Sequence, residues 1–253
     1  MLPLRFNQFL EGSDAALKSQ VRGILNTRKP KSKRGLLIVF EGCDGVGKST
    51  QFQNTVDWIE AQNYDLTETK WNSSKLLHDA ISDAKEDRIL SPMLYCLLHA
   101  ADMLVRYEQD VLPALEMNRI VVADRWVYTS IVRDKCRGVD VGILDEVYKG
   151  FQEPDILFHC VLPIHKAFTR LVKDGERLGH YGIGMDLNLA DNKEDNYVKY
   201  ENMLDKHYKE ILPLAKGYHK LDMDRSIDDI FIEVKQIIRD KTGISKYSRE
   251  DED

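Results

Sequence analysis

The 253-residue sequence has little cysteine and no long apolar run. Its four cysteines (Cys43, Cys96, Cys136 and Cys160) are scattered and form no C-x-x-C pair. This pattern argues against a zinc site or a disulfide framework and indicates reduced thiols. No apolar segment approaches the length needed to cross a bilayer, so no membrane partner is expected. Residues 1–14 lack a basic stretch followed by an apolar core, so we predict no secretory signal and a cytoplasmic location.

An excess of basic residues is also lacking. The formal net charge is −6 and the pI about 5.7, which removes a whole-chain electrostatic case for nucleic-acid binding. Residues 28–34 are locally basic; we interpret them as a solvated linker, with a nucleic-acid or partner patch as the alternative. The hydrophobic content of 43% and charged content of 31% are typical of a globular enzyme, and the length suits one large α/β domain.

What the sequence does contain is an apolar run, residues 36–40, that leads directly into G-x-x-x-x-G-K-[ST] at residues 42–49. The run has the length of a buried parallel strand, and the glycines allow successive N–H groups to curl around a phosphate. Lys48 can reach the β- and γ-phosphates, and the Ser49 hydroxyl can ligate Mg²⁺. A helix beginning near Lys48 would point its positive end at the same anion. The predicted nucleotide contacts are Gly42, Asp44, Gly45, Val46, Gly47, Lys48, Ser49 and Thr50.

Strand-like and helix-like segments alternate after this loop. The patterns predict strands near 64–69, 120–123, 156–162 and 218–223, and helices near 50–62, 74–83, 93–115, 139–151, 166–173, 196–215 and 227–240. We therefore expect an α/β fold with a parallel sheet covered by helices on both faces, and a site at the carboxyl ends of the strands. Residues 1–34 are predicted to be a helical extension with a basic linker, 35–246 the nucleotide-binding domain, and 247–253 an acidic disordered tail.

The second motif is Asp124-Arg125, which ends the strand predicted at 120–123. A carboxylate there can face the phosphate loop and hold Mg²⁺ together with Ser49, and an adjacent arginine can clamp a phosphate. The alternative is an ion pair at the end of a strand. Thr129 and Arg133 follow in a segment with hydroxyls and aromatics that suits a nucleotide acceptor, or else forms a surface helix with basic residues.

A Gly-rich, basic segment spans residues 169–185 and continues as a polar loop to 193. Phosphoryl transfer needs cations that arrive as the site closes, and Arg170 and Arg177 are the candidates. An ordinary mobile loop is the alternative. With Lys48, Asp124 and Arg125, these two arginines complete the predicted catalytic group.

The order of the motifs resembles that of thymidylate kinases over residues 35–240. The resemblance rests on Phe40-Glu41-Gly42 with Asp44 to Gln51, on the segments 97–102 and 112–115, on Asp124-Arg125-Trp126, and on residues 154–158. It implies the P-loop kinase fold, transfer of the γ-phosphate of ATP to a deoxynucleoside monophosphate with Mg²⁺, and commonly a homodimer.

The same resemblance implies individual roles. Asp44 matches the carboxylate that contacts the sugar 3′-hydroxyl of the acceptor, Arg125 the arginine on the acceptor phosphate, and Thr129 a small hydroxyl residue near the base. Gly45 stands where some members carry a catalytic arginine, which moves that role to Arg170 and Arg177.

The base-reading positions depart from the family. His99 stands in place of a stacking phenylalanine, and Met103 in place of an arginine that bonds to thymine. Arg133 stands near the position where the family has an aromatic residue that helps exclude ribose. Asn72 belongs to the segment that replaces an arginine-containing loop on the acceptor phosphate. We therefore expect a non-standard base specificity. Two other functions stay open: a kinase that uses polyphosphate, and a regulatory nucleotide-binding module or a kinase of a modified base in nucleic acid.

Overall fold

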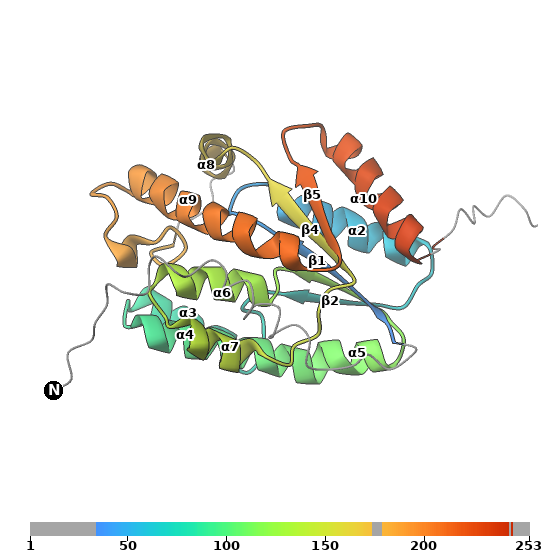
Figure 1. Cartoon of the computed structure of the whole chain (residues 1–253), viewed down its shortest axis with the longest axis horizontal. Coiled ribbons are helices and arrows are strands. Elements are labelled where there is room, and N and C mark those ends of the chain that lie inside the picture. The colour runs from blue at the N-terminus through green and yellow to red at the C-terminus, as the bar shows by residue number, and fades with distance from the viewer. Residues whose placement is uncertain (1–33, 174–178, 243, 245–253) are drawn as a thin grey trace, which may run out of the picture.

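The computed structural model describes residues 34–173, 179–242 and 244. Within them, five parallel strands form one sheet in the order β2-β3-β1-β4-β5. The strands are β1 (Leu36–Glu41), β2 (Leu66–Lys70), β3 (Ile120–Asp124), β4 (Ile156–Val161) and β5 (Tyr218–Asp222). The central strand β1 is apolar and fully buried from Leu37 to Phe40, as expected for a strand covered on both faces. The phosphate loop therefore leaves the sheet at its middle (Figure 1).

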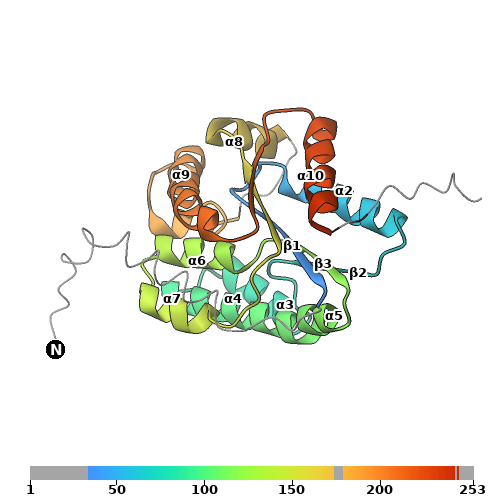
Figure 2. The same ribbon diagram turned by 45° about the vertical axis from the view of Figure 1, so that its right-hand side comes forward.

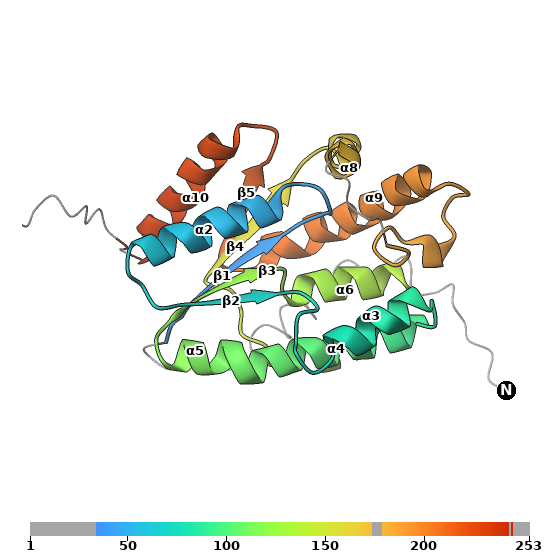
Figure 3. The same ribbon diagram turned by 180° about the vertical axis from the view of Figure 1, so that it is seen from behind.

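Helices cover both faces of this sheet, as predicted. On one face α2 (Lys48–Ala61) packs against α10 (Ile227–Thr242), and the two helices lie side by side when the molecule is seen from behind (Figure 3). On the other face α4 (Pro92–Arg106) packs against α6 (Val127–Cys136), and α6 in turn packs against α7 (Val141–Tyr148) and α9 (Lys193–Ile211). The strands are visible between these two groups in Figure 2. The remaining elements are α3 (His78–Glu86), η1 (Tyr107–Val111), α5 (Leu112–Glu116), α8 (Ile164–Lys173), η2 (Met185–Leu187) and η3 (Leu212–Leu214).

The long helix predicted at 93–115 is interrupted by a wider turn. Ser91 caps its start by accepting a hydrogen bond from Leu94 N, and Pro92 occupies the first turn, where no N–H is needed. The chain then passes through the π-helical turn η1 into α5. The sequence pattern predicted an interruption of the helix at Pro113. The structure places the interruption in η1, which ends two residues before Pro113. The proline cannot donate a backbone hydrogen bond.

Two segments differ from the sequence-based expectations. Residues 127–136 form α6, which is buried: Arg133 is only 3% exposed, which does not fit the surface-helix alternative. Arg34, assigned to a solvated linker, makes two 2.8 Å contacts from its guanidinium to Asp155, which also accepts from Leu37 N. The helix expected at 13–25 and the tail at 247–253 lie outside the described residues. In the part of the chain that the structure describes, no helix is long and apolar enough to span a membrane.

Candidate active site

The phosphate loop, residues 42–49, connects β1 to α2 and depends on glycine at three positions. Gly42, Gly45 and Gly47 have φ values of 138°, 74° and 96°. A Cβ at Gly42 would stand 2.4 Å from the Cys160 carbonyl oxygen, and one at Gly45 would stand 2.6 Å from the Ala167 carbonyl oxygen. Neither position has room for a side chain, because β4 and α8 pack directly against the loop. The backbone is thus held in the open curve that a phosphate requires.

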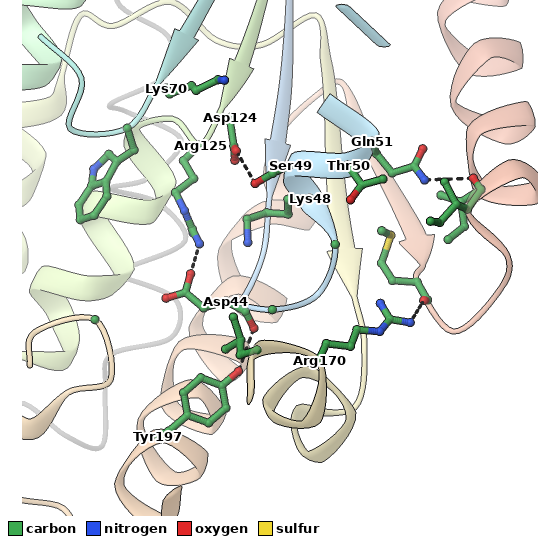
Figure 4. A pocket seen from close by; sticks show the side chains of 18 of the residues that line it. Asp44, Lys48, Ser49, Thr50, Gln51, Lys70, Asp124, Arg125, Arg170 and Tyr197 are labelled. Carbon is green, nitrogen blue, oxygen red and sulfur yellow. Dashed lines mark hydrogen bonds and ion pairs between the residues drawn. The ribbon is translucent and has the colours of Figure 1, made fainter. Parts of the chain in front are cut away.

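The side chain of Ser49, at the end of this loop, meets Asp124 at the end of β3 (Figure 4). Ser49 Oγ donates to Asp124 Oδ2 at 2.9 Å. Asp124 Oδ1 is buried and has no hydrogen-bond partner among the described residues. Hydroxyl and carboxylate oxygens are what Mg²⁺ prefers, and an orphaned carboxylate oxygen suits a cation. These residues therefore fit a magnesium ion that is also held by phosphates. No cluster of three or more His, Cys, Asp or Glu suited to a metal occurs within the described ranges.

Lys48 lies beside them, buried at the start of α2, and its Nζ donates to the Cys43 carbonyl. Burial and the nearby Arg125 lower the pKa of Lys48, while Asp44 and Asp124 act in the opposite direction. A phosphate in this loop would supply the counter-charge that the buried ammonium lacks.

Asp44 lies between two guanidinium groups, that of Arg125, just before α6, and that of Arg133, on α6. Arg125 pairs with one of its carboxylate oxygens, and Arg133 Nη2 lies 2.8 Å from the other. Burial opposes the charge on Asp44, but Arg125, Arg133 and Lys48 outweigh it and hold the pKa of Asp44 below its usual value. The buried carboxyl groups of Glu41 and Glu201 also lie near these two arginines, but burial raises the pKa of both, which favours their neutral forms and leaves part of the positive charge unbalanced. The cluster is therefore prepared for an anion.

Arg125 has a strained backbone, with φ at 74° in the left-handed region. Its Nη1 donates to the Gly42 carbonyl at 3.0 Å and to Thr129 Oγ1 at 3.1 Å. Such conformations persist only where surrounding contacts impose them, and they concentrate at functional sites.

A buried carboxylate, Glu41, holds the residues that follow Arg125, and the sequence did not single it out as a site residue. It accepts hydrogen bonds from Trp126 N at 2.8 Å, Thr129 N at 3.1 Å and Thr129 Oγ1 at 2.6 Å. The Trp126 and Thr129 amides belong to the start of α6, and the Thr129 hydroxyl lies beside them. Burial raises the pKa of Glu41, and Arg125 offsets part of that rise. Its position at the end of β1, beside Gly42, was the signal available in the sequence.

The loop is also tied to α9, which no local pattern in the sequence indicated. Glu201 Oε2 accepts from Asp44 N at 2.9 Å, and Tyr197 OH donates to the Asp44 carbonyl at 2.9 Å. Burial and the neighbouring Asp44 raise the pKa of Glu201 to about 7. Tyr208, one turn further along α9 from Leu204, places its hydroxyl 2.9 Å from Thr129 Oγ1.

Arg170 reaches the loop from α8. Its guanidinium donates to the Val46 carbonyl at 3.3 Å and to the Met223 carbonyl at 3.1 Å (Figure 4). It lines a cavity of about 610 Å³ together with Lys48, Ser49, Asp124 and Arg125. We call this the first cavity. The other predicted lid cation, Arg177, lies outside the described residues.

The described part of the predicted lid packs against α6. Arg137 donates to the Tyr181 carbonyl at 2.9 Å and to both oxygens of Asp186, at 2.8 and 3.0 Å. Tyr181 and Ile183 are buried. Lid closure on nucleotide binding stays a prediction.

The base-reading positions lie apart from the first cavity. Met103 is 0% exposed, and its sulfur accepts a hydrogen bond of 3.4 Å from Arg106 Nη2. His99 is 1% exposed, with the Trp71 ring stacked on it at 4.5 Å and the Tyr95 ring tilted against it at 4.1 Å between centroids. The buried imidazole therefore offers no exposed surface on which a base could stack. The structure does not bring these two predicted residues to the cavity.

The other two predicted acceptor contacts, Thr129 and Asn72, lie in different surroundings. Thr129 is fully buried beneath Arg125, as described above. Asn72 has φ at 57°, its carbonyl accepts from His78 Nδ1 at 2.7 Å, and its Oδ1 is buried without a partner among the described residues. Its neighbours Lys70 and Trp71 line the first cavity, although the sequence did not single them out.

A second cavity of about 440 Å³ adjoins the first. The two share Trp71, Gly179 and Gly182 in their walls. Rings and cations line it: Trp71, Tyr95 and Tyr181 with Lys85, Arg88 and Arg133.

A parallel sheet, a glycine-rich phosphate loop and a Ser–Asp oxygen pair beside a buried lysine together define a P-loop phosphotransferase. The model of the thymidylate kinase family matches residues 40–233. A probable thymidylate kinase 2 of Saccharolobus solfataricus is 34% identical over 81% of this chain and 96% of its own length. A thymidylate kinase of Finegoldia magna is 29% identical over 81% of this chain and 98% of its own, and a probable thymidylate kinase of Thermococcus kodakarensis is 30% identical over 54% and 71%. The chain belongs to the thymidylate kinase family and is a nucleoside monophosphate kinase.

Proposed function

We propose that this chain transfers the γ-phosphate of ATP to a deoxynucleoside monophosphate, and that its base specificity differs from that of a strict thymidylate kinase. The observation that carries the first part is the convergence of Lys48, Ser49, Asp124 and Arg125 on one cavity. The observation that carries the second is the burial of His99 and Met103.

The roles follow from the geometry. The loop N–H groups and Lys48 would hold the donor phosphates, and Ser49 and Asp124 would hold Mg²⁺, whose charge would offset that of the phosphates. Arg125 takes the acceptor phosphate, because its side chain and Asp44 face the same cavity. Arg170 lies close enough to the loop to stabilise charge that develops during transfer, the role left open by Gly45.

Thymidylate is the acceptor that the relatives' names imply. In this chain neither His99 nor Met103 can provide the contacts that would make thymidylate the sole acceptor. Rejection of a wrong base depends on buried polar groups that the wrong base leaves unpaired. We therefore propose an acceptor range that extends beyond thymidylate.

We also propose a homodimer. One side of α4 leaves large apolar side chains half in solvent: Leu94 is 39% exposed, Leu97 49% and Leu104 45%. They share one face at helical spacing, and such a row suits association with a second copy of the chain. Sedimentation velocity should show a dimer, and Leu97→Glu should shift it to monomer; a monomeric wild-type protein would contradict this assignment.

The test of function is a panel of nucleoside and deoxynucleoside monophosphates with ATP and Mg²⁺, followed by ADP release. We expect turnover with several deoxynucleotides, and none when polyphosphate replaces ATP. The absence of turnover with every monophosphate would refute the kinase assignment. A preference of 10³-fold or more for thymidylate over all others, which needs about 4 kcal/mol of discrimination, would refute the proposed specificity alone.

A further inference from the structure

The second cavity lies beside the acceptor end of the first cavity. Asp44, by resemblance the contact of the acceptor sugar, lines the first cavity, and Arg133, which bonds to it at 2.8 Å, lines the second. Trp71 belongs to both walls. A nucleotide whose phosphate is held by Arg125 and whose sugar lies at Asp44 therefore has its base directed at the second cavity. A volume of about 440 Å³ lies within the usual range of small-molecule sites.

The aromatic residues of this cavity suit a planar ligand. Trp71 is fixed by a hydrogen bond of 3.1 Å from its Nε1 to Ser130 Oγ, and His99 supports the indole from one side. Tyr95 and Tyr181 are buried in the same wall, with ring centroids 5.7 Å apart. Cations lie over these rings, Lys85 over Trp71 at 5.0 Å and Arg137 over Tyr95 at 4.1 Å from the centroids, so a base would meet rings and cations together.

The charged residues of the cavity are mostly cations. Lys85, Arg88 and Arg133 line it, and Glu86 is the sole acid in its described lining. The Lys85 ammonium lies 5.0 Å from the Trp71 ring and 5.9 Å from the Tyr95 ring, and within the described ranges it has no ion-pair partner. Arg133 Nε is buried without a hydrogen-bond partner there. The Arg133 Nε donor is buried and unpaired, which is costly, whereas the half-buried Lys85 ammonium keeps donors free for a ligand.

We propose that the second cavity holds the base of the acceptor nucleotide, and that Lys85 and Arg133 select bases whose edge presents carbonyl oxygens or an anionic substituent. This inference rests on the proposed function. It assigns base reading to residues of α3 and α6 in place of His99 and Met103 on α4. A base with amino groups at that edge would place donors against donors, which disfavours it.

The test compares acceptors in the wild-type enzyme and in Lys85→Met, with saturating ATP and Mg²⁺. The probes are dTMP, dUMP and 5-carboxy-dUMP, which present carbonyl or carboxylate oxygens, against dCMP and dAMP. We expect Lys85→Met to raise the KM of the first three by tenfold or more, to leave the KM of ATP within twofold, and to reduce the preference for 5-carboxy-dUMP over dCMP by at least tenfold. Lys85→Arg, which keeps the charge, should retain most of that preference.

A matched control is Lys235→Met. Lys235 is also half-buried and lies 4.7 Å from an aromatic ring, that of Phe231, but it lines neither cavity. Its removal should leave every acceptor constant unchanged. If wild-type enzyme turns over monophosphates while Lys85→Met keeps the same acceptor ranking, the base does not lie in the second cavity. If the wild-type enzyme turns over no monophosphate, the proposed function fails instead.

Discussion

The phosphate side and the base side of the site differ in how they use buried charge. On the phosphate side, Lys48, Asp124 and Arg125 line one cavity, and Asp124 Oδ1 has no hydrogen-bond partner among the described residues. On the base side as the resemblance places it, on α4, Arg106 lies in the core and donates to Asp102 and to Thr69, each at 2.9 Å, with Met103 buried beside it. Transfer chemistry constrains the first side tightly, whereas the second can be rebuilt around another acceptor while the fold persists.

The largest effect should come from the phosphate side. Lys48→Ala should reduce kcat by about 10²–10³-fold or more, because it removes a preorganised cation that meets developing charge. ADP release measures the loss, and a circular dichroism melt checks that the protein still folds. Turnover close to wild type in a folded Lys48→Ala enzyme would show that Lys48 does not stabilise phosphoryl transfer, and the phosphate side would lose its assigned role.

Arg125→Ala should act on the acceptor. We expect its KM for the monophosphate to rise and kcat to fall, together lowering kcat/KM about 10²-fold, with ATP affinity unchanged. Arg119→Ala is the control. The Arg119 side chain is 41% exposed, lies 3.9 Å from Asp65, and lines neither cavity. Loss of ATP binding with intact acceptor binding would contradict the assignment of Arg125.

A smaller effect should appear as pH changes. Burial, together with Arg133 of α6 and Arg137 directly after it, lowers the pKa of Lys85 to about 8, and the carboxylates of Asp102 and Asp44 counteract part of this. Lys85 is therefore charged below about pH 8 and neutral above it. The KM for a carbonyl-bearing acceptor should stay level up to pH 7 and rise a few-fold by pH 9.

The same profile in Lys85→Met serves as the reference, because it retains the titration of the nucleotide itself. The rise should be smaller there. Two superimposable profiles would show that Lys85 does not contribute to acceptor binding.

The smallest effect on specificity is expected at Met103. Met103→Leu conserves volume in the core, so it should cost less than about 1.5 kcal/mol of stability and leave the acceptor ranking unchanged. The monophosphate panel measures the ranking, and a thermal melt measures stability. A changed ranking in this variant would show that Met103 reads the base after all.

Sequence patterns predicted the fold, and they placed the phosphate-side candidates together, because both depend on local causes. The apolar strand at 36–40, the three loop glycines and Asp124-Arg125 each constrain the backbone within a few residues, and the structure brings them together. Arg133 was assigned to the acceptor segment, and its contact with Asp44 fits that choice.

The base side could not be predicted because its contacts join distant segments. His99 is covered by Trp71 and Tyr95, of which only the second is on its own helix, and Lys85 reaches the cavity from α3. Glu201 and Tyr208 approach from α9, more than 70 residues after Thr129. No spacing within the sequence reports such a convergence, whereas Glu41, directly beside Gly42, carried a local signal that a search for buried helix caps would have found.

Gly45 limits how this enzyme can be redesigned. Its missing Cβ is the space that α8 occupies, with Leu171 Cγ at 2.7 Å from where that atom would stand. A loop arginine introduced by single substitution at position 45 would displace α8 and, with it, Arg170. An arginine at the loop position, which the family resemblance assigns to some members, and the close approach of α8 in this chain therefore exclude each other. Engineering one into the other requires changing the helix and the loop in the same step.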